Sequence, residues 1–157
     1  MPDRRYIAGH NPPNLTDRIL AHSAELAVIL LGCILGPLVS IGALLPGEHP
    51  TPALAGLGLV PTLLLGVSVA CGSALWGVSI LRHYEDLADM WRTMRLGMGL
   101  AGSGWAGAAL AALVEHPSWA STWITCTGVA TICAVGLWST VLTERRLRAL
   151  VQEVHDR

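Results

Sequence analysis

The sequence lacks lysine and phenylalanine, and charged residues make up only 13% of its 157 residues. A soluble domain carries about 25% charged residues, so this composition indicates a membrane protein. Four long apolar stretches contain no Asp, Glu, Lys, Arg or His. Proton-coupled pumps, exchangers and voltage sensors need ionisable groups at membrane depth, and a b-type haem needs facing histidines there. The absence of such residues argues against all of these classes.

Enzyme motifs are also missing. There is no Ser-His-Asp or HExxH arrangement, and the pairs Gly97-x-Gly99 and Gly102-x-Gly104 fall inside an apolar stretch rather than in a phosphate-binding loop. All four cysteines lie inside the stretches without a CxxC spacing, so we interpret them as small hydrophobic residues. The net charge of −1 gives little attraction for nucleic acid. We therefore expect no catalytic activity, no cofactor and no nucleic-acid partner.

The four apolar stretches are each long enough to cross about 30 Å of hydrocarbon as a helix. They cover residues 26–45, 53–81, 96–114 and 119–142. A strand interpretation fails because apolar and polar residues do not alternate. The sequence therefore predicts an all-α membrane protein with a four-helix transmembrane domain at 26–142. A cytoplasmic segment at 1–25, a cytoplasmic linker at 82–95 and an amphipathic tail at 143–157 complete the expected organisation.

The arginines predict how the chain crosses the membrane. All ten precede the first stretch, lie between the second and third, or follow the fourth. Cytoplasmic connections carry an excess of basic residues, so we expect both termini in the cytoplasm. The absence of lysine and phenylalanine is typical of a GC-rich bacterial coding sequence, so the expected location is a bacterial inner membrane. The outer connections at 46–52 and 115–118 are short, which favours two antiparallel hairpins.

An internal duplication is one interpretation of the two expected hairpins. Glu48-His49-Pro50 recurs as Glu115-His116-Pro117, and Cys71 through Trp76 recurs as Cys133 through Trp138. Two halves with an even number of spans would form a parallel repeat. Chance matching between apolar segments is the alternative.

Small residues recur at helical spacing in three of the expected spans. Lipid does not drive helices together as water does, so close backbone contact between small residues supplies much of the association. The third span is the richest in Gly and Ala, and we expect it to be the most enclosed, within the bundle or at a contact with another subunit. Coding bias is the alternative explanation for its Gly and Ala content. The expected packing residues are Gly32, Gly36, Ser40, Gly66, Ala70, Ala74, Gly99, Gly102 and Ala106.

Two segments on the expected cytoplasmic side have the apolar spacing of amphipathic helices. In the linker, Trp91 suits the level of the lipid headgroups. The tail either lies on anionic lipid or forms a short coiled coil between subunits. The residues expected at the membrane interface are Arg82, Trp91, Arg95, Arg145, Arg146 and Arg148.

The outer connections hold the candidates for a polar site, Glu48, His49, Glu115 and His116. If the hairpins lie side by side, these groups could bind a divalent metal or respond to pH. The alternative is that they cap helix ends where water begins. Threonines in the fourth span either line a watery pore or bond across helices or to their own backbone. Pro37 and Pro61 predict kinks, with a gating hinge as the alternative.

In general form the chain resembles small phage holins, with few spans, Gly/Ala-rich helices, short loops and a charged tail. The likeness is one of type and rests on no shared motif, and many holins have fewer than four spans. It implies membrane permeabilisation or a channel-like function through helix oligomerisation, with the lipid bilayer and further copies of the chain as partners. An accessory or scaffold subunit that docks on another membrane protein, and a small facilitative transporter, are the alternatives.

Overall fold

The computed structural model describes residues 14–45, 52–82 and 87–155, and these residues are helical almost throughout. Four helices are long and apolar enough to cross a membrane, which confirms the expected class of multi-pass helical protein. The elements in chain order are α2 (Leu15–Ala21), α3 (Ser23–Leu44), the 3₁₀ helix η1 (Pro52–Leu57), α4 (Leu59–Leu81), α5 (Leu87–Glu115) and α6 (Ala120–His155).

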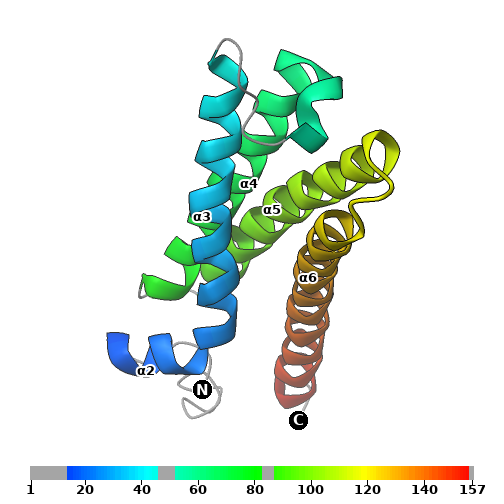
Figure 1. Cartoon of the computed structure of the whole chain (residues 1–157). Helices are drawn as coiled ribbons and strands as arrows, with labels where there is room; N and C mark the ends of the chain where they lie inside the picture. The colour runs from blue at the N-terminus through cyan, green and yellow to red at the C-terminus, as the bar shows by residue number, and fades with distance from the viewer. Residues whose placement is uncertain (1–13, 46–51, 83–86, 156–157) are drawn as a thin grey trace.

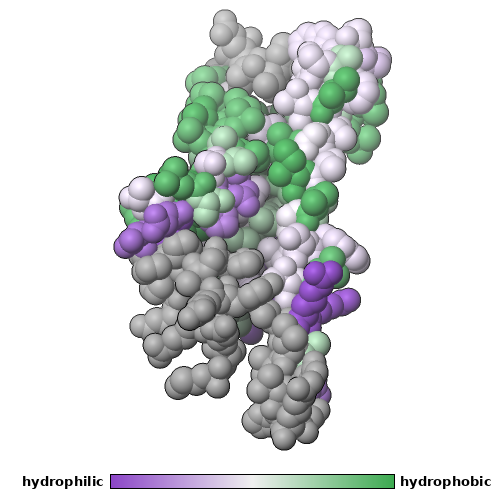
Figure 2. All heavy atoms as spheres, turned by 90° about the horizontal axis from the view of Figure 1, so that it is seen from below, coloured by the Kyte–Doolittle hydropathy of each residue, from purple (hydrophilic) through white to green (hydrophobic). Residues whose placement is uncertain are grey.

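The two ends of the molecule are distinct (Figure 1). The short helix α2 and the C-terminal end of α6 lie at one end, here called the α2 end. The 3₁₀ helix η1 and the connection from α5 to α6 lie at the opposite end, here called the η1 end. Seen from the α2 end, hydrophilic residues form separate groups among apolar ones (Figure 2).

The spans pack in chain order, α3 on α4, α4 on α5 and α5 on α6. The contact between α4 and α5 is the most extensive, and no contact of comparable extent joins α6 to α3 or α4 among the described residues. The spans therefore form an open row and not a closed bundle. The central helices α4 and α5 are equally buried, so the third span shares the most enclosed position with the second, and α6 is the least buried. The internal duplication remains a prediction.

Glycines set the distance between neighbouring helices in this row. A methyl group at Gly36 would lie 2.6 Å from the backbone nitrogen of Ala70 and 2.7 Å from the carbonyl oxygen of Gly66. A methyl group at Gly97 would lie 2.5 Å from the backbone nitrogen of Trp76, whose side chain is only 1% exposed. Real side-chain carbons do not approach so closely, so only glycine permits these backbone contacts.

Pro61 does not break α4, because it lies in the first turn of this helix. Gly58 has a φ of 77°, a conformation that glycine adopts without steric cost, and it turns the chain from η1 into α4. Pro61 is the third residue of α4, where the backbone N–H would have no partner within the helix in any case. Thr62 anchors the turn, since its hydroxyl donates to the carbonyl oxygens of Gly58 at 2.8 Å and Leu54 at 3.3 Å. Pro37 lies in the interior of α3.

The two amphipathic segments continue the spans as single helices. Residues 87–95 form the first turns of α5, and the tail up to His155 belongs to the 36-residue helix α6. Met90, Trp91 and Met94 are buried, each no more than 7% exposed. These side chains therefore pack against other helices, as an apolar stripe allows, and the expected level of Trp91 at the lipid headgroups stays a prediction.

Candidate functional site

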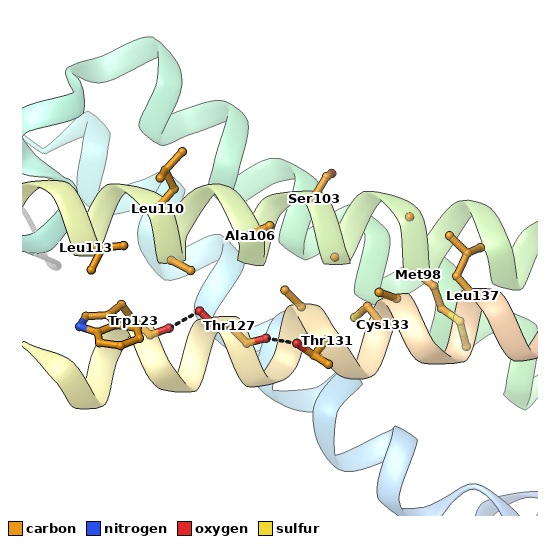
Figure 3. Close-up of a pocket in the computed structure, with 15 residues that line it drawn as sticks. Met98, Ser103, Ala106, Leu110, Leu113, Trp123, Thr127, Thr131, Cys133 and Leu137 are labelled. Carbon is orange, nitrogen blue, oxygen red and sulfur yellow. Dashed lines mark hydrogen bonds between the residues drawn. The ribbon is translucent and has the colours of Figure 1, made fainter.

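A groove of about 620 Å³ runs between α5 and α6 (Figure 3). The side chains on α5 that line it are mostly small, and Gly99, Gly102, Ser103 and Ala106 occur at helical spacing. Larger apolar groups close its two ends, with Leu113 and Trp123 toward the connection between the helices and Met98 and Leu137 at the other end. The groove is open to the surroundings and not an enclosed cavity. It exists because small side chains on α5 leave space that α6 does not fill.

The helices α5 and α6 touch at particular points beside this groove. A methyl group at Gly102 would lie 3.0 Å from the Cβ of Cys133, and one at Gly136 would lie 3.0 Å from the sulfur of Met98. By contrast, a methyl group at Gly99 would meet no atom within 4 Å, and Ala106 is exposed. Gly102 therefore faces the contact with α6, whereas Gly99 and Ala106 border open space.

Several threonine hydroxyls on α6 donate hydrogen bonds to carbonyl oxygens of the same helix. The hydroxyl of Thr127 donates to the carbonyl oxygen of Trp123 at 2.7 Å, and that of Thr131 donates to Thr127 at 2.8 Å (Figure 3). Thr125 donates in the same way to Ser121 at 2.7 Å. All three side chains are exposed. Each donor is satisfied within the helix while oxygen lone pairs stay free, so this surface is compatible with lipid and can also accept hydrogen bonds from water.

An ion pair joins α5 and α6 beyond the groove, on the side toward the α2 end. The guanidinium of Arg95 donates to the carboxylate of Glu144, and the two side chains are 27% and 15% exposed. Both residues fall within the helical segments that could span the membrane, just beyond the charge-free stretches expected from the sequence. Sequence reasoning placed Arg95 at the interface and overlooked Glu144. The available signal was the opposite charge of two residues at corresponding ends of antiparallel helices.

The remaining packing candidates lie along α3 and α4. Gly36 and Gly66 face each other across this contact, and Ser40, whose hydroxyl donates to the carbonyl of Gly36 at 3.0 Å, lies against Gly66. Gly32 lies against the side chain of Ser73. Ala70 borders Gly36, whereas Ala74 is exposed.

The Glu-His candidates are only partly described. Glu48 and His49 lie outside the described residues. Glu115 ends α5 with its carboxylate against Gly56 of η1, and the His116 ring stacks on Trp119 with 4.9 Å between ring centroids. Within residues 14–45, 52–82 and 87–155 there is no group of three or more His, Cys, Asp or Glu side chains that could hold a metal ion. Metal binding or pH sensing at these loops stays a prediction.

The arginines expected at the interface differ in environment. Arg82 is exposed at the C-terminal end of α4, and Arg145 and Arg146 are exposed on α6. Arg148 also belongs to α6, but its side chain lies outside the described part of the chain.

Comparison of the chain with protein-family models, curated proteins and solved structures finds no match. The groove, the hydroxylated surface of α6 and the ion pair are therefore the features that point to a function.

Proposed function

We propose that this protein is a non-enzymatic, holin-like membrane protein that permeabilises a bacterial inner membrane by associating with further copies of itself. The observation that carries the proposal is the packing of α6, which contacts α5 extensively and leaves an open groove of about 620 Å³ beside it. In this proposal the termini are cytoplasmic and the groove receives a helix of a neighbouring copy.

The chemistry of the groove supports helix association. Transmembrane helices associate through close van der Waals contact, and small residues permit that contact. Gly99, Ser103 and Ala106 form such a surface on α5, and a ridge of large side chains on another helix would fill the space they leave. Large apolar side chains are found on α6 outside the groove. Val135 and Trp138 are more than 60% exposed there and suit contact with lipid.

The threonines support permeabilisation. When copies associate, hydroxylated helix surfaces that face one another can admit water, because each threonine oxygen still accepts hydrogen bonds. Thr125, Thr127 and Thr131 lie exposed on α6, the helix with the fewest constraints from the rest of the chain. Association followed by rearrangement of α6 would thus convert a lipid-facing surface into a water-lined one.

Induced expression in bacteria tests this proposal. Membrane potential and entry of a normally excluded dye would be followed, with the amount of protein in the membrane measured in parallel. We expect abrupt depolarisation and dye entry with the wild-type chain. Gly99→Leu and Ala106→Leu should delay or abolish depolarisation and dye entry, because each substitution fills the groove. At Gly99 an added methyl group meets no atom of the same chain within 4 Å.

Gly128→Leu is the matched control. Gly128 is exposed on α6 outside the groove lining, and a methyl group there meets no atom within 4 Å. The control should permeabilise like the wild type. A polarised, growing culture at confirmed membrane expression would contradict the proposal, as would equal effects of the groove and control substitutions.

A facilitative transporter is the second candidate, favoured by a different feature. A cavity of about 280 Å³ near the η1 end is bordered by residues of α3, η1, α4, α5 and α6, including Trp105 and Trp119. Saturable flux of a small apolar solute, without loss of membrane potential, would support this function. Recovery of another membrane protein with the wild-type chain but not with Ala106→Leu would instead support an accessory or scaffold subunit.

A further inference from the structure

Arg18 on α2 is a buried cation without a partner among the described residues. Its side chain is 7% exposed, and its Nε and Nη1 atoms are buried with no hydrogen-bond acceptor. Within the described segments it is the one charged residue that reaches this degree of burial. Arg95 and Arg92, by comparison, pair with Glu144 and Asp89.

The carboxylates nearest to Arg18 in the sequence are already engaged. Asp17 accepts a hydrogen bond from the side-chain amide of Asn14 at 3.3 Å. Glu25 pairs with the ring nitrogen Nδ1 of His22 at 3.0 Å. Two guanidinium nitrogens that are buried without an acceptor are strongly unfavourable, so this position calls for an anion that the described neighbouring residues do not provide.

The location of α2 narrows the chemistry of that anion. The helix lies across the end of α3 at the α2 end and packs against α3 and α4 (Figure 1). Its large apolar side chains are turned outward, with Leu15 50%, Ile19 42% and Leu20 69% exposed. A short helix with apolar groups exposed at the end of a span is stable in the interfacial region of a bilayer, where lipid phosphates lie.

We propose that Arg18 forms a binding site for a phosphate group, with a membrane phospholipid as the source that the apolar surface of α2 favours. The planar guanidinium matches phosphate oxygens in a bidentate geometry. Leu15 and Leu20 lie on the same short helix, where acyl chains of the same lipid can cover them. The site is independent of the groove and of the permeabilising function proposed above.

Thermal unfolding of the full chain in phosphate-free neutral detergent tests this site. Phosphatidylglycerol or inorganic phosphate would be added, and bound lipid would be counted by native mass spectrometry. At 100-fold excess over the Kd, phosphatidylglycerol should raise the wild-type midpoint by about 5–10 °C. Arg18→Gln should lose this shift and the bound lipid, and Arg18→Lys should retain only part of it, because Lys keeps the charge without the planar fork.

Arg92→Gln is the matched control, since it removes the same charge from a side chain that is 81% exposed. It should retain the full lipid shift. A shift with phosphatidylglycerol alone assigns a lipid, whereas an equal shift with inorganic phosphate assigns a soluble phosphate compound. Equal responses of the Arg18→Gln and Arg92→Gln variants would overturn the proposal.

The lipid-free baseline gives a second criterion. Arg18→Gln should be at least as stable as the wild type without phosphate, because it removes an unpaired buried charge. A clear loss of stability under these conditions would mean that Arg18 pairs with a carboxylate of its own chain, and this would also overturn the proposal.

Discussion

Removal of Glu144 should loosen α6, because Glu144 forms the ion pair with Arg95 that links α6 to α5. In the Glu144→Gln variant, the guanidinium of Arg95 loses its charged partner, and its Nε is already buried without an acceptor. Breaking a fully buried pair costs about 3–5 kcal/mol, and an exposed pair contributes about 0–1 kcal/mol. With side chains 27% and 15% exposed, this pair lies between the two cases, and we expect a loss of about 1–3 kcal/mol.

A double-mutant cycle isolates this ion pair from the other interactions of the two residues. The free energy of unfolding would be measured by denaturant titration in mixed micelles for Arg95→Gln, Glu144→Gln and the double variant. The double variant should be less destabilised than the sum of the single variants, with a coupling of about 1–2 kcal/mol. Arg92→Gln, at an exposed pair, should change stability by no more than about 0.5 kcal/mol.

Additive single effects would refute this reasoning. A coupling below about 0.5 kcal/mol would show that Arg95 and Glu144 act independently, through solvent or lipid and not through each other. In that case the ion pair would not constrain α6, and the apolar packing of α6 on α5, including the tight contacts at Gly102 and Gly136, would hold the helices together.

Two further predictions concern the helix contacts. Gly72→Ala should destabilise the protein by about 1–3 kcal/mol, because the added methyl group would lie 2.8 Å from the carbonyl oxygen of Gly97. Gly128→Ala should instead stabilise α6 by about 1 kcal/mol, because its methyl group meets no atom within 4 Å. Denaturant titration of both variants checks this contrast. Thr62→Val should cost about 1–2 kcal/mol and increase protease cleavage near η1, because it removes the hydrogen bonds to Leu54 and Gly58; unchanged cleavage would mean that these bonds do not hold η1.

The sequence was sufficient to predict the four spanning helices, since length and freedom from charge are local properties. The close contact at Gly36 and Gly66 also follows from spacing of small residues. The neighbours of each helix could not be predicted, because in a membrane protein the faces toward lipid and toward other helices are both apolar. Trp91 illustrates this ambiguity, as the same amphipathic stripe fits a membrane surface and a helix contact.

Charge was the second feature that the sequence left undetermined. Counting arginines predicts topology but treats every arginine as exposed to solvent or headgroups. In the structure Arg18 is buried, Arg95 is paired and Arg92 is exposed, although all three are arginines on the same expected side. These differences depend on which helix packs beside each residue, which no spacing rule supplies.

The open row of helices connects the packing to the proposed function. A span with neighbours on two sides gains contact energy from both, as α4 and α5 do, whereas α6 is packed extensively against α5 alone. It is held by the buried apolar side chains of Cys126, Val129 and Cys133, by the glycine contacts and by the Arg95–Glu144 pair. The rest of its surface faces the surroundings of the protein. Because a neighbouring copy would compete with lipid and not with another helix of the chain for that surface, association requires no prior disruption of the α3–α4–α5 contacts. Thus α6 is the helix that can move on association with the smallest loss of contact energy within the chain. It is also the helix that bears the exposed threonines.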